Sequence, residues 1–126
     1  MREIIKTDSA PEPKGPYSQA VAANGFVFVS GQGPINPTTN QFELGDVKSQ
    51  TRRVLENIAE ILKSAGLTMM DVVKSSVFLT NINDFKEMNE VYSEYFSEGK
   101  PARTTVEAAG LPFGIKVEID VIAALK

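Results

Sequence analysis

The stretch "DVKSQTRRVLENIAEILKSAG", residues 46–66, carries the clearest periodic pattern in the chain. Its apolar side chains recur every three to four residues, which predicts an amphipathic helix with one buried face. Asp46 suits the N-cap, and Gly66 suits the position where such a helix ends. The apolar positions are Val47, Val54, Ile58, Ile61 and Ala65, with Leu55 and Leu62 widening the stripe.

The segment that follows, "DVVKSSVFLTN" (71–81), is rich in β-branched residues and predicts a strand covered on both sides. Successive side chains of a strand point to opposite faces. We therefore expect one face to carry Val73, Val77 and Leu79, and the other to carry Val72 and Phe78.

A second helix is predicted over "DFKEMNEVYSEYF", residues 84–96. Asp84 and Glu87 have the spacing of a capping box at its start. One face of this helix carries Phe85, Met88, Tyr92 and Tyr95, and we interpret Tyr92, Tyr95 and Phe96 as core residues.

Strands are expected on both sides of these elements. In "SQAVAANGFVFVSGQGP" (18–34), Asn24-Gly25 accepts the positive φ angles of a tight turn and predicts a hairpin. Further strands are expected at 2–7, 102–108 and 115–125. Residues 1–126 are thus predicted to form a single α+β domain, with two helices packed on one face of a mixed sheet.

Such an arrangement leaves the second face of the sheet without a cover. By alternation along the strands, that face would include Val72, Phe78, Ile122 and Ala124. These side chains are too apolar to face water over a whole sheet. We therefore expect a closed homo-oligomer that buries this face.

The composition is that of an ordinary globular protein, with 126 residues, 42% hydrophobic and 23% charged. The net charge is −3, and the Lys and Arg residues form no block, which disfavours nucleic acid as a partner. No apolar stretch approaches the length of a membrane span, and the first residues lack a secretory apolar segment. We therefore expect a cytoplasmic protein with no membrane partner.

The chain contains no Cys and no His. Disulfides, thiolate nucleophiles and Ser-His arrangements are therefore excluded, together with the commonest zinc ligands. Any catalysis must use Glu, Asp, Lys, Tyr, Arg, backbone groups or water.

Arg103 is the first of two charged residues in "GKPARTTVEAAGLPFGIKVEID" (99–120) that invite a functional interpretation. In an extended strand it shares a face with Thr105 and Glu107, and its planar guanidinium suits a bidentate carboxylate or phosphate. A surface arginine paired with a nearby acid is the simpler interpretation from the residues alone.

Glu118 is the second, and it alternates with apolar residues on its strand. Asp120, two residues on, fits a strand with one solvated face, but Ile122 and Ala124 continue that same face. We therefore expect Glu118 at the edge of a buried interface. Burial there would raise the carboxyl pKa, and the group could orient a water or take up a proton.

The glycines of "VSGQGP", residues 29–34, either end a strand or let the backbone approach a ligand. They form no dinucleotide fingerprint, because a third glycine and a following helix are missing.

Four stretches together resemble the RidA/YjgF/YER057c/UK114 family of small imine deaminases, namely "GPYSQAV", "FVFVSGQGP", "PARTTVEAAGLP" and "KVEIDVIA". They cover essentially the whole chain in order. The resemblance implies a chorismate-mutase-like fold and a homotrimer whose sheets face inward, with ligand clefts between subunits. This agrees with the uncovered sheet face expected above.

The resemblance also implies hydrolysis of reactive 2-imino acids to 2-keto acids and ammonia, with no metal or organic cofactor. The substrates would be 2-iminobutanoate and 2-iminopropanoate, the latter formed from 2-aminoacrylate, and their removal protects pyridoxal-phosphate enzymes. Arg103 then matches the carboxylate-binding residue of the family, and Glu118 matches the residue that orients the attacking water. The other substrate-binding positions implied are Tyr17, Ser30, Gly31, Asn89 and Thr105.

Two positions depart from the family pattern. Many relatives have Ser or Ala in place of Thr104, and Cys in place of Thr105. The implied nucleophile is water, so the missing cysteine leaves the activity in place. Two alternatives stay open: a non-catalytic trimer that binds small carboxylates, and the translation-inhibiting ribonuclease activity attached to some relatives.

Overall fold

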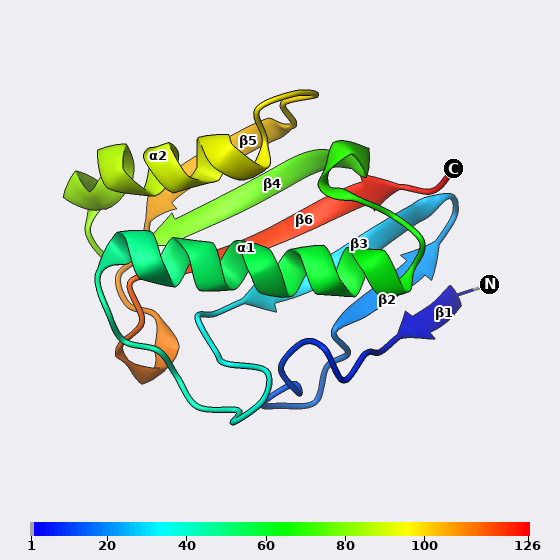
Figure 1. Cartoon of the computed structure of the whole chain (residues 1–126), viewed down its shortest axis with the longest axis horizontal. Helices are drawn as coiled ribbons and strands as arrows, with labels where there is room; N and C mark the ends of the chain where they lie inside the picture. The colour runs from blue at the N-terminus through cyan, green and yellow to red at the C-terminus, as the bar shows by residue number, and fades with distance from the viewer. Residues whose placement is uncertain (1) are drawn as a thin grey trace.

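The computed structural model describes residues 2–126, which form one six-stranded sheet and two helices (Figure 1). The strands are β1 (Arg2–Ile5), β2 (Ala20–Ala23), β3 (Phe26–Gln32), β4 (Val72–Leu79), β5 (Ala102–Glu107) and β6 (Val117–Ala124). The helices are α1 (Val47–Ser64) and α2 (Phe85–Tyr95). The spatial order is β1-β2-β3-β6-β4-β5, with β4 and β5 parallel and all other neighbours antiparallel. The predicted α+β class and mixed sheet are confirmed.

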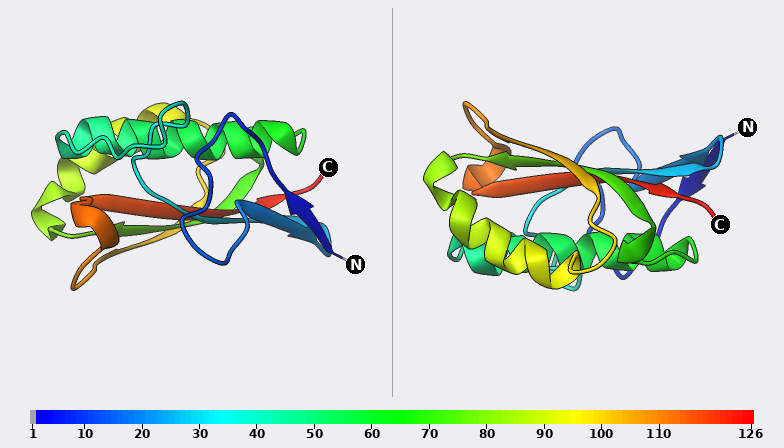
Figure 2. Two further views of the ribbon diagram at one scale, coloured as in Figure 1. Left: turned by 90° about the horizontal axis from the view of Figure 1, so that it is seen from below. Right: turned by 90° about the horizontal axis from the view of Figure 1, so that it is seen from above.

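Both helices lie on the same face of the sheet, as the two edge-on views in Figure 2 show. The longer helix, α1, packs against β3, β6 and α2. Its Leu55, Ile58 and Leu62 are fully buried. The predicted apolar stripe is therefore the face that joins the helix to the sheet, and its burial stabilises the core.

The predicted ends of α1 and the predicted hairpin are also confirmed. The Asp46 side chain accepts a hydrogen bond from the backbone N–H of Ser49 at 2.8 Å. Gly66 follows the helix with φ of 76°. In the hairpin turn, Asn24 and Gly25 have φ of 52° and 86°, as a tight two-residue turn requires.

The predicted capping box at the start of α2 is wrong. A short 3₁₀ turn, Ile82–Asp84, precedes the helix, and the Asn81 side chain accepts a hydrogen bond from the N–H of Asn83 at 2.9 Å. Asp84 already has helical φ and ψ, and its side chain makes no capping hydrogen bond. The turn has thus moved the capping role three residues upstream.

The second face of the sheet carries several large apolar side chains that are open to solvent in the single chain. Phe26 and Phe28 on β3 are 40% and 44% exposed, and Val106 on β5 is 41% exposed. Phe78, Ile122 and Ala124 lie on this face, as predicted, and are partly buried. An apolar surface of this extent is typical of an interface between subunits.

The predicted facing of Val72 and Val73 is wrong. Val72 is buried beneath the helices, whereas Val73 is 45% exposed. The pairing of β4 with β6 shifts its register between Val72 and Lys74, so an extra residue interrupts the alternation there. The side chains of β4 therefore alternate regularly between the two faces of the sheet only from Lys74 onward.

Within residues 2–126, neither helix combines the length and the apolar character that a membrane crossing requires.

Candidate functional site

Arg103 lies on β5, an outer strand of the sheet, and its side chain faces α2. On the neighbouring strand, the partner of Arg103 in register is Ser75, which points into the layer between sheet and helices. Nη1 of Arg103 donates a hydrogen bond to Oδ1 of Asn89 at 2.7 Å. Two residues predicted for the site, Arg103 and Asn89, are thus in direct contact.

Two aromatic rings of α2 flank the same guanidinium. Cζ of Arg103 lies 4.7 Å from the ring centroid of Tyr92 and 5.5 Å from that of Phe85. Both distances are within the range of cation–π attraction. The guanidinium is therefore held by its charge as well as by its hydrogen bond.

A buried hydrogen bond to Ser75 holds the Tyr92 ring in place. Its hydroxyl and the Ser75 hydroxyl share a hydrogen bond of 2.6 Å, and both residues are buried. Burial raises the pKa of Tyr92 above its ordinary value, so the phenol stays neutral at physiological pH. Tyr92 was predicted to be a core residue, and its contact with Arg103 was not predicted.

A hollow of about 240 Å³ opens beside Arg103. It is lined by α2 and by the loop to β5, including Asn89, Tyr92 and Pro101. Thr105 shares the strand face of Arg103 but does not line this hollow. Its hydroxyl is buried and has no hydrogen-bond partner among residues 2–126.

Glu118 lies near the start of β6, opposite a bulge in β3. The register between β3 and β6 shifts between Val29 and Gln32, which turns Gly31 toward the Glu118 side chain. A Cβ placed on Gly31 would lie 2.5 Å from Oε2 of Glu118. Only glycine leaves space for the carboxylate at this position.

The hollow around Glu118 has a volume of about 370 Å³ and brings together four residues predicted for the site: Tyr17, Ser30, Gly31 and Glu118. Pro112 completes its wall and was not foreseen. The Ser30 hydroxyl donates to the carbonyl of Ser18 at 2.6 Å. Tyr17 is half exposed, so its ring stands at the mouth of the hollow.

The Glu118 carboxylate combines a raised pKa with the lack of a hydrogen-bond partner within residues 2–126. Burial, followed by the nearby charge of Asp120, raises the pKa of Glu118 above its ordinary value. No hydrogen bond joins the carboxylate to another group of residues 2–126. A carboxylate in this state is available to a water or a ligand.

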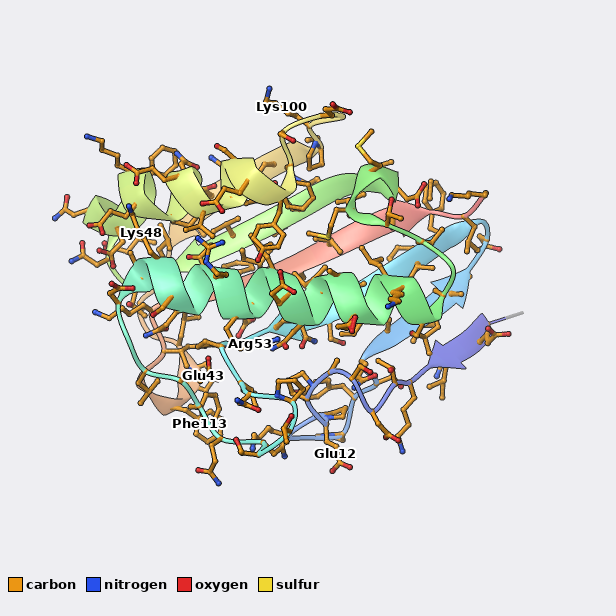
Figure 3. The ribbon with its side chains drawn as sticks, in the orientation of Figure 1. Glu12, Glu43, Lys48, Arg53, Lys100 and Phe113 are labelled. Carbon is orange, nitrogen blue, oxygen red and sulfur yellow. The ribbon has the colours of Figure 1, made fainter. Side chains whose placement is uncertain are left out.

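Within one chain, the Arg103 and Glu118 side chains lie on opposite faces of the sheet. Glu118 pairs with Phe78 of β4 on the open face, whereas Arg103 pairs with Ser75 beneath α2. Figure 3 shows Lys100, which lines the Arg103 hollow, at the top of the molecule, and Phe113, next in the chain to Pro112 of the Glu118 hollow, at the lower left. The two predicted catalytic residues therefore do not meet in the single chain.

One of the two site residues that were not foreseen, Tyr92, has a signal in the sequence, and the other, Pro112, has none. Asn89 and Tyr92 are three residues apart on a helix, so they share a face, and that spacing could have linked Tyr92 to the site. Pro112 stands in a loop, and nothing in its sequence context indicates a contact with Glu118. No cluster of three or more acidic side chains that could hold a metal occurs in the described part of the chain.

Comparison with known proteins extends these observations. A family model described as "Endoribonuclease L-PSP" matches residues 7–125. A RutC family protein of Pyrococcus horikoshii is 54% identical over 98% of both chains. Reactive Intermediate Deaminase A, chloroplastic, of Arabidopsis thaliana is 44% identical, matching 98% of this chain and 66% of that protein. The crystal structure of E. coli TdcF with bound serine has a TM-score of 0.93 and 42% identity, covering 98% of this chain and 99% of that one.

These matches span the sheet, both helices and both hollows. The family model alone covers all the residues discussed above as parts of the site. The chain therefore belongs to the endoribonuclease L-PSP family, the RidA/YjgF group that its sequence resembles, whose members include a reactive intermediate deaminase.

Proposed function

We propose that the protein hydrolyses small 2-imino acids to 2-keto acids and ammonia, without a metal or organic cofactor. In the cytoplasm this would protect pyridoxal-phosphate enzymes from reactive imines. The observation that carries the proposal is the state of Glu118: half-buried, raised in pKa and free of hydrogen bonds within residues 2–126, beside a hollow. Such a carboxylate can orient a water and accept its proton.

Substrate binding falls to Arg103. Its guanidinium is positively charged and planar, and it can donate two parallel hydrogen bonds to a substrate carboxylate. The contacts with Asn89 and Tyr92 hold it in place before a ligand arrives, which lowers the entropic cost of binding.

The reaction then needs only water and proton transfers. Glu118 accepts a proton as the water oxygen forms a bond to the imine carbon, and the C=N π electrons move to nitrogen. In the second stage the protonated nitrogen leaves as ammonia while the new hydroxyl loses its proton and becomes the keto oxygen. The carboxyl form of Glu118 can supply the proton that the nitrogen takes.

Because Arg103 and Glu118 face away from each other in one chain, we infer that the substrate lies between two copies. One copy supplies Arg103 and the next supplies Glu118. A ring of three copies, which the family resemblance implies, would repeat this site at each contact and bury the open sheet face. The bound serine of the E. coli relative supports a site of amino-acid size.

The first test is a coupled assay with threonine dehydratase and threonine. Semicarbazide traps the imine, and the 2-keto acid is followed with time. The proposal expects faster keto acid formation and less trapped imine, and expects both effects to be lost in Arg103→Ala. A folded wild-type protein that binds small carboxylates but does not accelerate hydrolysis would instead support the binding trimer.

A second test addresses the shared site. Arg103→Ala and Glu118→Gln are each expected to be inactive alone. After the two are unfolded and refolded together, random assortment around a cyclic oligomer restores about one quarter of the contacts. Activity that stays at the level of the single variants, with mixed assemblies shown by mass spectrometry, would place both residues in one copy's site and contradict the inference.

A further inference from the structure

Two fully buried amide side chains interrupt the apolar face of α1. Gln50 and Asn57 are both 0% exposed, although the rest of that buried face consists largely of leucine, isoleucine and valine. They are about two helical turns apart, so they lie on the same side of the helix. Burying an amide is unfavourable unless its donor and acceptor groups are paired. The hydrogen-bond partners of these two side chains therefore indicate what the amides contribute.

Gln50 joins the segment before α1 to the start of β6. Its Nε2 donates a hydrogen bond to the carbonyl of Gly45 at 2.8 Å, and its Oε1 accepts one from the backbone N–H of Lys116 at 2.8 Å. The carbonyl of Lys116 accepts a further hydrogen bond from the N–H of Thr80 at 3.1 Å. Both backbone groups of Lys116 are thus held in place, two residues before Glu118.

Asn57 holds the chain where it leaves β3. Its Nδ2 donates a hydrogen bond to the carbonyl of Ile35 at 2.9 Å, in the turn that follows the Gly31 bulge. Its Oδ1 accepts hydrogen bonds from Nε and Nη2 of Arg53 at 3.2 and 3.0 Å. In Figure 3, Arg53 lies just below α1, on the side of the helix where Phe113 also lies. A guanidinium can only donate, so Arg53 fixes which end of the amide faces the turn.

The two segments held by these amides border the Glu118 site, whereas α1 itself does not. Ile35 and Ile115, the residue before Lys116, line a small cavity that adjoins the Glu118 hollow. No residue of α1 lines that cavity or the hollow. The approach of Gly31 to the Glu118 carboxylate depends on how the end of β3 lies against the start of β6. The two amides connect both of these strand ends to one helix.

We propose that Gln50 and Asn57 are positioning residues for the reaction, which hold the ends of β3 and β6 so that the Glu118 carboxylate faces its hollow. The inference rests on the proposed function and adds to it two residues that do not touch the substrate. A displacement of a reacting group by about 1 Å can cost about 10²-fold in rate. Loss of either amide should therefore lower kcat, whereas KM, which depends on Arg103, should stay nearly unchanged.

The test compares two variants of similar side-chain size in the coupled imine assay. Gln50→Met and Asn57→Leu remove the hydrogen bonds to β6 and to the turn after β3. Each should lower kcat by about 10- to 100-fold and change KM by less than about twofold. Urea unfolding of each variant measures the loss of stability separately.

Thr51→Val is the matched control on the same helix. Thr51 is also 0% exposed, and its hydroxyl donates to the carbonyl of Val47 at 2.7 Å, within α1. Its removal should lower the free energy of unfolding, because a buried carbonyl loses a partner. It should leave kcat and KM of the folded protein unchanged, since this hydrogen bond leads to neither strand end.

Gln50→Glu separates positioning from stability in a second way. A carboxyl oxygen can still accept the hydrogen bond from the N–H of Lys116, so kcat should recover most of the loss seen in Gln50→Met. A kcat that falls in proportion to stability across all these variants, Thr51→Val included, would overturn the inference. A folded Gln50→Met and a folded Asn57→Leu that both keep the wild-type kcat would overturn it as well.

A last measurement does not require turnover. Carbon-13 NMR follows the titration of the Glu118 carboxyl, whose pKa should fall toward its ordinary value in Gln50→Met and not in Thr51→Val, because a displaced carboxyl is less buried. The other charged groups near it, Asp120 on β6 and Glu12 and Lys14 in the adjoining loop, are the same in both variants. A wild type that hydrolyses no imine would overturn the proposed function. An unchanged Glu118 titration in Gln50→Met would overturn the positioning role on its own.

Discussion

The two hollows of the molecule are built in opposite ways. Around Arg103, the guanidinium is hydrogen-bonded to Asn89 and flanked by two rings, one of which is fixed by Ser75. Around Glu118, the carboxylate has space on the Gly31 side and no protein hydrogen bond within residues 2–126. The guanidinium is thus held in place by protein contacts, whereas the carboxylate has no hydrogen-bond partner within residues 2–126.

This difference matches the two roles proposed for the site: Arg103 binds the substrate, and Glu118 transfers protons. A group that only binds benefits from being rigid before the substrate arrives. A group that transfers protons benefits from an unsatisfied, partly desolvated state, because burial brings its pKa closer to the working pH. Substitutions of Glu118, Arg103 and Tyr92 test these separate roles.

Glu118→Gln should lower kcat by about 10²- to 10⁴-fold, because an amide cannot accept the proton of the attacking water. The measurement is 2-keto acid formation in the coupled assay. Asp120→Asn is the matched control, since Asp120 lies two residues along β6 on the same face and burial raises its pKa as well. Equal losses of kcat in the two variants would mean that the combined negative charge of this strand face matters. That result would contradict a specific role for Glu118.

Arg103→Lys should raise KM by about 10- to 100-fold with a smaller change in kcat. Lysine keeps the charge but lacks the planar fork that contacts Asn89 and stacks on Tyr92. Arg52→Lys serves as the control, because Arg52 pairs with Glu94 on the exposed side of the helices. An unchanged KM in Arg103→Lys would show that charge alone suffices and that the built geometry is unimportant.

Tyr92→Phe should lower the free energy of unfolding by about 1 to 3 kcal/mol, because the buried Ser75 hydroxyl loses its partner. KM should change little, since the ring beside Arg103 remains. Urea unfolding at a fixed protein concentration measures the first effect. Tyr95→Phe, which removes an exposed hydroxyl bonded to Glu56, should have a clearly smaller effect on stability. Equal effects would contradict the role given to the buried pair.

The smallest expected effect is on the pH dependence of stability. The folded pKa of Glu118 is raised, so between its ordinary value of 4.5 and the folded value the folded state binds the proton more tightly. Stability should therefore fall as the pH rises through this window, and Glu118→Gln should remove that part of the slope. Unfolding free energies of both proteins from pH 4 to pH 8 test this. A difference that stays constant with pH would contradict the raised pKa.

Much of the fold follows from local sequence signals. The period of residues 46–66 and the Asn24-Gly25 turn each depend on neighbouring residues only, and both elements form as predicted. The errors arise where alternation or spacing is interrupted. The bulge after Val72 reverses the facing of two valines, and a 3₁₀ turn displaces the predicted cap at Asp84.

The sequence predicts a list of candidate site residues, but it does not predict how they are arranged in space. The sequence motifs identify Arg103 and Glu118 as candidates. Alternation along each strand does not show whether side chains on two different strands point to the same face of the sheet. Only the pairing of Arg103 with Ser75 and of Glu118 with Phe78 reveals that they face opposite ways. Likewise, the Gly31 bulge depends on a register shift between two strands that are far apart in sequence.

The close approach of Gly31 to Glu118 also bears on how an activity is assigned to a related protein from its sequence. A Cβ at this position would lie 2.5 Å from Oε2 of Glu118, so any residue other than glycine requires the carboxylate to shift. A relative with a side chain at the position of Gly31 therefore cannot keep its glutamate in the same place, even if the glutamate is retained. The two positions should be examined jointly when a family member is assigned an activity, because neither is informative alone.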